Sequence, residues 1–334
     1  MKNKLVLVAV VAIVLGLLVS CEKSESPTET PAATSKAVYI LNGLGSTISV
    51  LDLNTDAVTN NVTQCGTWPN QVAYYDGKLF VVNSGSNNVQ VRSADTYALL
   101  GTIDLGANNN PMNIAILNAQ KGYVTCSQSN TVKVVNLSTY SVTTTVAAGV
   151  GTTGIIIASG KVYATNTAST WPTYGQGTVT VINTTTDAVI TTINVELNPQ
   201  AAAVAPDGKV HVVCTGDYGT APGKVVVIDP ATDAIVKTIT VGGAPGNIAI
   251  SGSSIGYLGT FGTGLITYNT TTYAIRDSST NTLLKKAGSG TVIDASGNIY
   301  VADFANDQVV KLDNTHAVKK TYDVGDGPLS LSVK

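Results

Sequence analysis

Trp and Phe are scarce in this sequence, and most of them fall between the predicted strands. Only two Trp and three Phe occur among 334 residues. A ring at a loop rim buries much area on a ligand and loses little side-chain entropy, so it suits recognition better than bond-making chemistry. The candidates for ligand contact are Trp68, Trp171, Tyr174, Tyr218, Phe261 and Phe304. The alternative is that each ring fills the seam between neighbouring sheets.

Three amides recur at one position, two residues after a loop proline. They are Gln71, Asn113 and Asn247, which follow Pro69, Pro111 and Pro245. An amide can donate to and accept from a ligand, but it can equally satisfy the backbone of a neighbouring strand. Because the position repeats, the backbone role is favoured, and the three amides remain candidates for ligand binding.

No set of side chains indicates covalent or acid–base catalysis. The two histidines are His211, in a predicted strand, and His316, in a predicted turn. General acid–base chemistry would have to use carboxylates alone, and no pair stands out. We therefore expect a protein that is not an enzyme and carries no cofactor. A lyase or hydrolase that uses carboxylates is the alternative.

Metal binding and disulfides are equally little supported. Two histidines cannot form a multi-histidine centre. The spacing of Cys65, Cys126 and Cys214 matches no zinc motif, and three thiols allow at most one disulfide. Cys126 and Cys214 end predicted strands, which favours a role as small buried apolar residues. The sequence does not decide whether any of the three forms a disulfide.

The composition limits the kind of partner. Charged residues make up 12% of the chain, hydrophobic residues 44%, and the formal net charge is −2. Because no cluster of Lys or Arg compensates, we expect no nucleic-acid partner. The apolar fraction is ample for a packed core and excludes wholesale disorder.

The elements that must position these residues form a repeat. A short apolar strand led by an aromatic residue or His recurs at intervals of 41, 43, 40, 48, 46 and 43 residues. A 40–50-residue unit made only of short strands is typical of a β-propeller. The seven strands begin at Tyr39, Phe80, Tyr123, Tyr163, His211, Tyr257 and Tyr300. The sequence therefore predicts an all-β protein, a seven-bladed propeller of four-stranded antiparallel blades.

Turn residues divide each repeat in the same way. A Gly-bearing tight turn precedes the aromatic strand, as at Asp76-Gly77 and Asp207-Gly208. An Asp or Asn three residues before a Thr follows the next strand, as at Asn183 to Thr186. This pattern of strands and turns resembles the YVTN-repeat family of seven-bladed propellers (YncE-like proteins), and the resemblance spans residues 37–334.

The register of the repeats predicts how the ring closes. Residues 37–42 match the second strand of a blade, and residues 328–333 match an innermost strand. We therefore expect 328–333 to complete the first blade and remove an exposed edge. In such blades the loops from strand two to three and from strand four to one share a face, which we call the loop face. It carries the longer loops, including the insertion 167–177, and is expected to carry the function.

The first residues of the sequence predict a targeting signal. Residues 1–20 combine Lys2 and Lys4 with an apolar run, as in a signal peptide. Leu18-Val19-Ser20-Cys21 resembles the bacterial lipobox, which implies that Cys21 is lipidated, for example with palmitate, and anchors the chain. An uncleaved anchor helix is the alternative. Residues 21–36 are expected to be a flexible tether, and 37–334 the propeller.

These expectations combine into one hypothesis. The protein is predicted to be a monomeric lipoprotein of the outer membrane, exposed on the cell surface or, alternatively, facing the periplasm. It would bind a small molecule, glycan or protein on its loop face without catalysis. Resemblance to surface propeller lipoproteins of gut bacteria implies a further alternative, capture of cobalamin or another corrinoid for an outer-membrane transporter.

Overall fold

The computed structural model of the chain describes residues 37–170, 173–260, 263–285 and 288–334. In these ranges every regular element is a β-strand. No helix in them has the length and apolar character needed to cross a membrane. The predicted Cys21, Trp171 and Phe261 lie outside the described residues.

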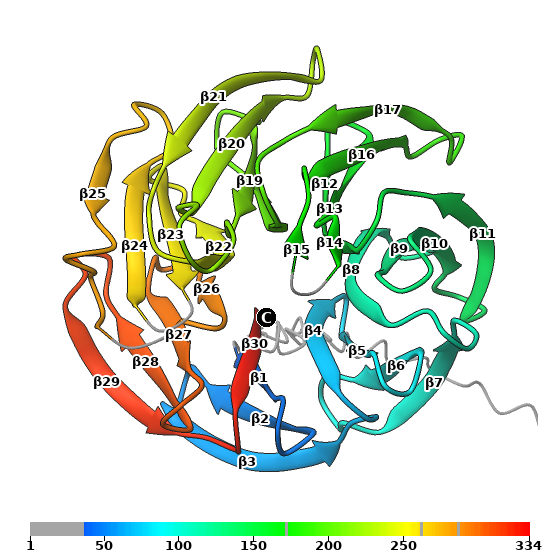
Figure 1. The fold of residues 1–334 in the computed structure, drawn as a ribbon. Coiled ribbons are helices and arrows are strands. Elements are labelled where there is room, and N and C mark those ends of the chain that lie inside the picture. The colour runs from blue at the N-terminus through cyan, green and yellow to red at the C-terminus, as the bar shows by residue number, and fades with distance from the viewer. Residues whose placement is uncertain (1–36, 171–172, 261–262, 286–287) are drawn as a thin grey trace, which may run out of the picture. The chain divides into compact units, whose positions relative to one another are not determined.

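Seven four-stranded antiparallel sheets form a ring around a central channel, which confirms the predicted seven-bladed propeller (Figure 1). From the channel outward, blade 1 consists of β30 (Pro328–Val333), β1 (Ala37–Asn42), β2 (Thr47–Asp52) and β3 (Ala57–Gln64). Blade 2 consists of β4 (Pro69–Tyr75), β5 (Lys78–Asn83), β6 (Asn88–Ser93) and β7 (Leu99–Asp104). Blade 3 consists of β8 (Pro111–Asn118), β9 (Lys121–Cys126), β10 (Thr131–Asn136) and β11 (Ser141–Ala147).

The remaining blades repeat this order. Blade 4 consists of β12 (Thr152–Ala158), β13 (Lys161–Asn166), β16 (Thr178–Asn183) and β17 (Val189–Asn194), with a small hairpin, β14 (Ser169–Thr170) and β15 (Thr173–Tyr174), inserted on its loop face. Blade 5 consists of β18 (Pro199–Val204), β19 (Val210–Cys214), β20 (Lys224–Asp229) and β21 (Ala234–Thr240). Blade 6 consists of β22 (Pro245–Ile250), β23 (Ile255–Thr260), β24 (Gly264–Asn269) and β25 (Ile275–Asp277). Blade 7 consists of β26 (Thr291–Ile293), β27 (Ile299–Asp303), β28 (Gln308–Leu312) and β29 (Val318–Asp323).

Burial follows the position of each strand in its blade. The second strands, such as β5 and β27, are buried along almost their whole length because neighbouring blades cover both faces. The outermost strands, such as β21, are mostly exposed. The seven apolar clusters lie between adjacent sheets, so each seam between blades contributes a part of the core.

The ring closes as the register predicted. β30 pairs antiparallel with β1, from Val38 opposite Val333 to Leu41 opposite Ser330. Ser330 and Ser332 also cap the next blade, because their hydroxyls accept hydrogen bonds from the Val72 and Tyr74 amides at 3.3 and 2.8 Å. β30 therefore forms hydrogen bonds with two strands: a ladder with β1 in its own blade, and side-chain contacts with β4 of the neighbouring blade.

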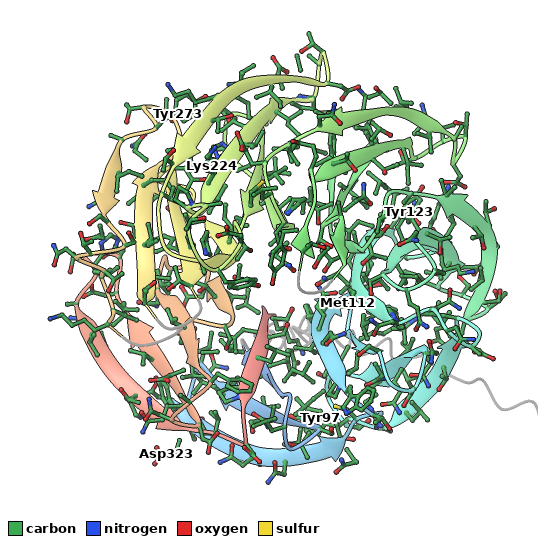
Figure 2. The ribbon with its side chains drawn as sticks, viewed as in Figure 1. Tyr97, Met112, Tyr123, Lys224, Tyr273 and Asp323 are labelled. Atoms are coloured by element: carbon green, nitrogen blue, oxygen red, sulfur yellow. The ribbon has the colours of Figure 1, made fainter. Side chains whose placement is uncertain are left out.

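An interblade latch joins successive blades on the side opposite the loop face. Its first half is a ring on a strand of one blade. Its second half is the residue of the neighbouring blade's three-to-four turn that has a positive φ. These seven turn residues are Asp56, Tyr97, Tyr140, Asp187, Asp233, Tyr273 and His316. Figure 2 shows Tyr97, Tyr123 and Tyr273 far from the channel, whereas Met112 lies close to it.

Three latches combine a Tyr, a Lys and an Asp, and one of them joins Tyr322 and Lys320 of blade 7 to Asp56 of blade 1. The Tyr123 hydroxyl donates to Asp187 at 2.7 Å, and Lys121 pairs with that carboxylate at 2.8 Å. In the next seam Tyr163 and Lys161 bind Asp233, both at 2.7 Å. Burial, reinforced by the hydrogen bond to the carboxylate, raises the pKa of both tyrosines. The carboxylates of these turns are therefore structural.

Both histidines belong to this set of contacts. His211 is fully buried, its Nδ1 lies 2.8 Å from the Tyr268 hydroxyl, and its ring faces Tyr273 at 6.4 Å. His316 Nε2 lies 2.8 Å from the Tyr257 hydroxyl. The packing interpretation of His211 is confirmed, and neither ring lies at the channel.

We expect His211 to make stability depend on pH. Burial lowers its pKa to about 4, whereas the ordinary value is 6.5. The unfolded chain therefore takes up a proton first, and stability declines as pH falls from about 6.5 to about 4, by about 3 kcal/mol in all. Urea unfolding across this range measures the slope. His211→Phe introduces the residue type that blade 2 has at the equivalent position, Phe80. This variant should flatten the slope of stability against pH, and an unchanged slope would contradict the assignment.

The three cysteines of the described residues are buried and free. Burial raises the pKa of the Cys65 and Cys214 thiols to about 12 and that of Cys126 to about 11. All three therefore stay neutral at physiological pH, in keeping with the predicted role of Cys126 and Cys214 as small apolar residues.

Candidate functional site

The loop face is built by backbone hydrogen bonds between its two kinds of loop. Ser84, in a two-to-three loop, donates its amide to the carbonyl of Trp68, in a four-to-one loop, at 2.9 Å. The same contact joins Thr215 to Asn198 at 2.9 Å. These pairings bring the two loop types together, so the candidate residues on both lie on one side of the ring.

Trp68 is unusual in two respects, its backbone conformation and the exposure of its side chain. Its φ is +50°, and the equivalent residues before the inner strands are Asn110, Asn198 and Gly327, types that tolerate this conformation. Its side chain is 72% exposed, with the ring beside Gly85. A bulky residue held in a costly conformation without burial contributes little to the fold, and such sites concentrate where function does.

Tyr174 and Tyr218 meet across the seam between blades 4 and 5. Tyr174 ends the inserted hairpin at β15, and Tyr218 lies in the loop between β19 and β20. Their ring centroids are 5.7 Å apart with the planes tilted by 56°. Tyr218 is 50% exposed, and its partial burial raises the pKa of its hydroxyl. The sequence did not predict that these two rings form a pair.

Phe304 lies in a different setting. It is half-buried, and its ring would touch a Cβ placed on Gly327, which Leu44 of blade 1 also approaches. Phe304 therefore lies at the seam between blades 7 and 1, which is the position that the seam-filling alternative expects.

The three predicted amides line the mouth of the central channel. Two adjoining cavities of about 250 and 360 Å³ share Gln71, Asn113 and Asn247. Gln71 Oε1 accepts the Ile114 amide at 2.6 Å, and Asn113 Nδ2 donates to the Thr153 carbonyl at 3.1 Å. These two amides bridge neighbouring inner strands, as the backbone role predicts.

Asn247 differs from its two counterparts. Its Oδ1 is buried and has no hydrogen-bond partner among the described residues. Thr291 Oγ1, on the next inner strand, is also buried without a partner there and lines the same cavity. Unsatisfied buried polar atoms carry a desolvation cost that a bound donor would relieve.

Sequence reasoning missed two residues of this mouth. Gln200 lines both cavities and donates to Asn198 Oδ1 at 2.7 Å. It directly follows Pro199, one position earlier than the amides that the repeat singled out. Thr291 follows no loop proline, so the repeat gave no signal for it. The resulting mouth offers amide, hydroxyl and backbone groups, which can bind a ligand by hydrogen bonds.

Solved structures with low sequence identity share this architecture. Kuenenia stuttgartiensis hydrazine synthase is similar over 79% of this chain and 89% of its own, with 16% identity and a TM-score of 0.66. A quinoprotein alcohol dehydrogenase-like protein from Bacteroides thetaiotaomicron is similar over 89% of this chain and 78% of its own, with 16% identity and a TM-score of 0.65. Apo AztD from Citrobacter koseri is similar over 90% of this chain and 98% of its own, with 13% identity and a TM-score of 0.55. At these identities the likeness shows the fold alone.

No curated protein matches the sequence significantly. One family model does match, over residues 49–257, which is more than half of the chain and runs from blade 1 into blade 6. The chain therefore belongs to the family described as a domain of unknown function, DUF5074.

Proposed function

We propose that this protein is a lipid-anchored binding protein of the cell envelope that recognises its ligand on the loop face without catalysis. The observation that carries the proposal is the exposure of aromatic rings there: Trp68 is 72% and Tyr218 50% exposed, and Tyr174 pairs with Tyr218. Rigid rings on a fixed frame are the residues that most often dominate binding energy. The amide-lined channel mouth adds hydrogen-bonding groups beside them.

The paired tyrosines give the proposal its test. The soluble domain 37–334 would first be screened by gel filtration and calorimetry against cyanocobalamin, haem and a glycan panel, and by pull-down for a protein partner. Tyr174→Ala combined with Tyr218→Ala should then weaken the ligand found by about 10- to 100-fold, because each ring contributes as an interface anchor.

The control for this experiment uses exposed side chains on outermost strands. Ile190 and Val318 are 45% and 55% exposed, and their replacement by Ala should leave binding unchanged. Melting should be unaffected in both double variants. Full affinity in the double Tyr variant would refute the loop-face assignment, and turnover lost on replacing one carboxylate would favour the enzyme alternative.

The anchoring part of the proposal is supported by the sequence before residue 37. A basic start, an apolar run and Leu18-Val19-Ser20-Cys21 together are typical of lipoprotein signals. Cys21→Ser should move the protein from the membrane to the soluble fraction and abolish incorporation of labelled palmitate. Protease treatment of intact cells would separate a surface location from a periplasmic one.

A further inference from the structure

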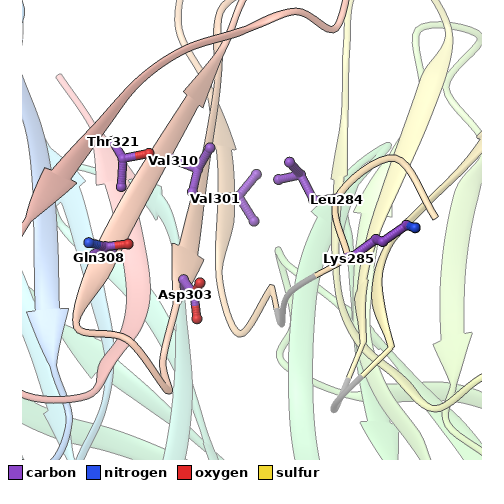
Figure 3. A pocket seen from close by; sticks show the side chains of 7 residues that line it. All are labelled: Leu284, Lys285, Val301, Asp303, Gln308, Val310 and Thr321. Carbon is purple, nitrogen blue, oxygen red and sulfur yellow. The ribbon is translucent and has the colours of Figure 1, made fainter.

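A pocket separate from the channel lies between blades 6 and 7. Its volume is about 280 Å³. Figure 3 shows two walls, Leu284 and Lys285 on one side and the sheet of blade 7 on the other. The blade 7 wall consists of Val301, Asp303, Gln308, Val310 and Thr321.

The pocket exists because the outermost strand of blade 6 is short. β25 has three residues, whereas the outermost strands of the other blades have six to eight. It pairs with β24 only at Asp277 and Ile275. A longer β25 would cover more of the sheet of blade 7. Because β25 is short, the segment that follows it faces this part of blade 7 instead.

That segment is fixed close to β24. Leu265 donates its amide to the Leu284 carbonyl at 3.0 Å and accepts that of Leu283 at 2.9 Å. Gly264 permits this approach, since its φ is +107° and a Cβ there would lie 1.7 Å from the Leu284 oxygen. The wall that carries Leu284 and Lys285 is therefore a built feature of the fold.

The blade 7 wall contains a buried carboxylate. Asp303 is 3% exposed and occupies the end of the second strand, where blades 1, 2 and 4 have Asn42, Asn83 and Asn166. Its two oxygens accept from the Asn306 amide at 2.9 and 2.8 Å. Within the described residues Asp303 forms no ion pair. A buried carboxylate with no cation is costly, so this position favours a positively charged guest.

The other groups define the rest of that guest. Val301 lies opposite Val310 in the sheet, and Leu284 faces them across the pocket, so its middle is aliphatic. Lys285 is exposed and forms no ion pair among the described residues. It lies on the wall opposite Asp303 with its ammonium end directed away from blade 7, and a rotation of its flexible side chain would bring it to a negative group at the far end of a ligand.

We infer that the pocket between blades 6 and 7 binds a small organic ammonium compound with an aliphatic body, such as an alkylamine or an ω-amino acid. The ammonium group donates to Asp303, and the aliphatic body packs on Val301, Val310 and Leu284. Where the ligand also has a carboxylate, Lys285 pairs with it. This site is distinct from the paired tyrosines of the loop face.

Calorimetry on the domain 37–334 with three matched compounds tests the inference. Pentylamine and 6-aminohexanoate should bind, whereas hexanoate, which lacks the amino group, should not. Asp303→Asn should weaken both amines by at least about 30-fold, because it removes the charged partner of a buried pair. Lys285→Gln should weaken 6-aminohexanoate by about threefold and leave pentylamine unchanged, since the pair between Lys285 and the carboxylate is exposed.

The controls separate a lost site from a lost fold. Asp303→Asn places the residue of three other blades at this position, so melting should be retained. Val310→Phe fills the aliphatic middle and should abolish binding by a second route. Tyr174→Ala with Tyr218→Ala should leave amine binding intact, so the two sites fail independently. Absence of binding by both amines at millimolar concentration, or full affinity in Asp303→Asn, would overturn the inference.

Discussion

Removal of residues 328–334 is expected to abolish the cooperative melting of the domain. The deletion takes away β30, the innermost strand of blade 1, and with it the ladder to β1. Each lost ladder hydrogen bond costs about 1 kcal/mol, and each newly exposed apolar side chain about 1.5–3 kcal/mol. The sum approaches the roughly 5–15 kcal/mol that stabilises a whole domain. Circular dichroism against temperature measures the effect.

A permuted chain provides the control. Val333 lies opposite Val38, and the Lys334 amide donates to the Ala37 carbonyl at 2.8 Å. A short linker can therefore join residues 328–334 to the start of β1 as a hairpin. This permutant should recover the melting temperature of the intact domain. A truncated domain that melts like the intact one would show that β30 does not hold the ring closed.

The second large effect is expected at the latch between blades 4 and 5. Asp233 accepts from Tyr163 and Lys161, and its side chain is only 11% exposed. Asp233→Ala leaves the buried Tyr163 hydroxyl without its acceptor, leaves Lys161 with the Pro230 carbonyl but no counter-charge, and puts Ala at a φ of +57°. We expect a loss of about 3–5 kcal/mol in the free energy of unfolding, from the broken pair and the strained turn together. Urea unfolding measures it.

Two variants divide this effect into its parts. Asp233→Asn keeps a residue that tolerates the left-handed conformation and an acceptor for Tyr163, and loses only the charge, so its cost should be smaller. Asp207→Ala removes a surface pair with Lys209, which contributes less than about 1 kcal/mol. Equal costs for Asp233→Ala and Asp207→Ala would argue against a structural latch.

The fold could be predicted from the sequence because each blade repeats the same pattern of strands and turn residues. Asp52 and Asn183 accept the amides two and three residues later, as the Asx-turn pattern requires. The residues that join blades were less visible. Asp187 and Asp233 look like ordinary turn residues, and their partners Tyr123 and Tyr163 lie more than sixty positions earlier.

The candidate site was predicted only in part, for a similar reason. Departures from the repeat, such as Trp68 where most other blades have Asn or Gly, can be found by aligning the repeats. Contacts between blades cannot, because the pairing of Tyr174 with Tyr218 depends on how an insertion folds back. Gln200 was not predicted because it directly follows its proline, so it is equivalent to Asn70 and not to Gln71; the register shift after the proline is the same in blades 2, 5 and 6.

The place of β1 inside its sheet has a mechanical consequence. β1 is hydrogen-bonded to β2 on one side and to β30 on the other. A pull on the chain before Ala37, directed along the strand, would load both ladders in shear, so their bonds must break together. A strand at a sheet edge pulled sideways would unzip one bond at a time. The start of the domain at β1 is therefore built to resist tension, which is the load that the proposed lipid anchor would place on it.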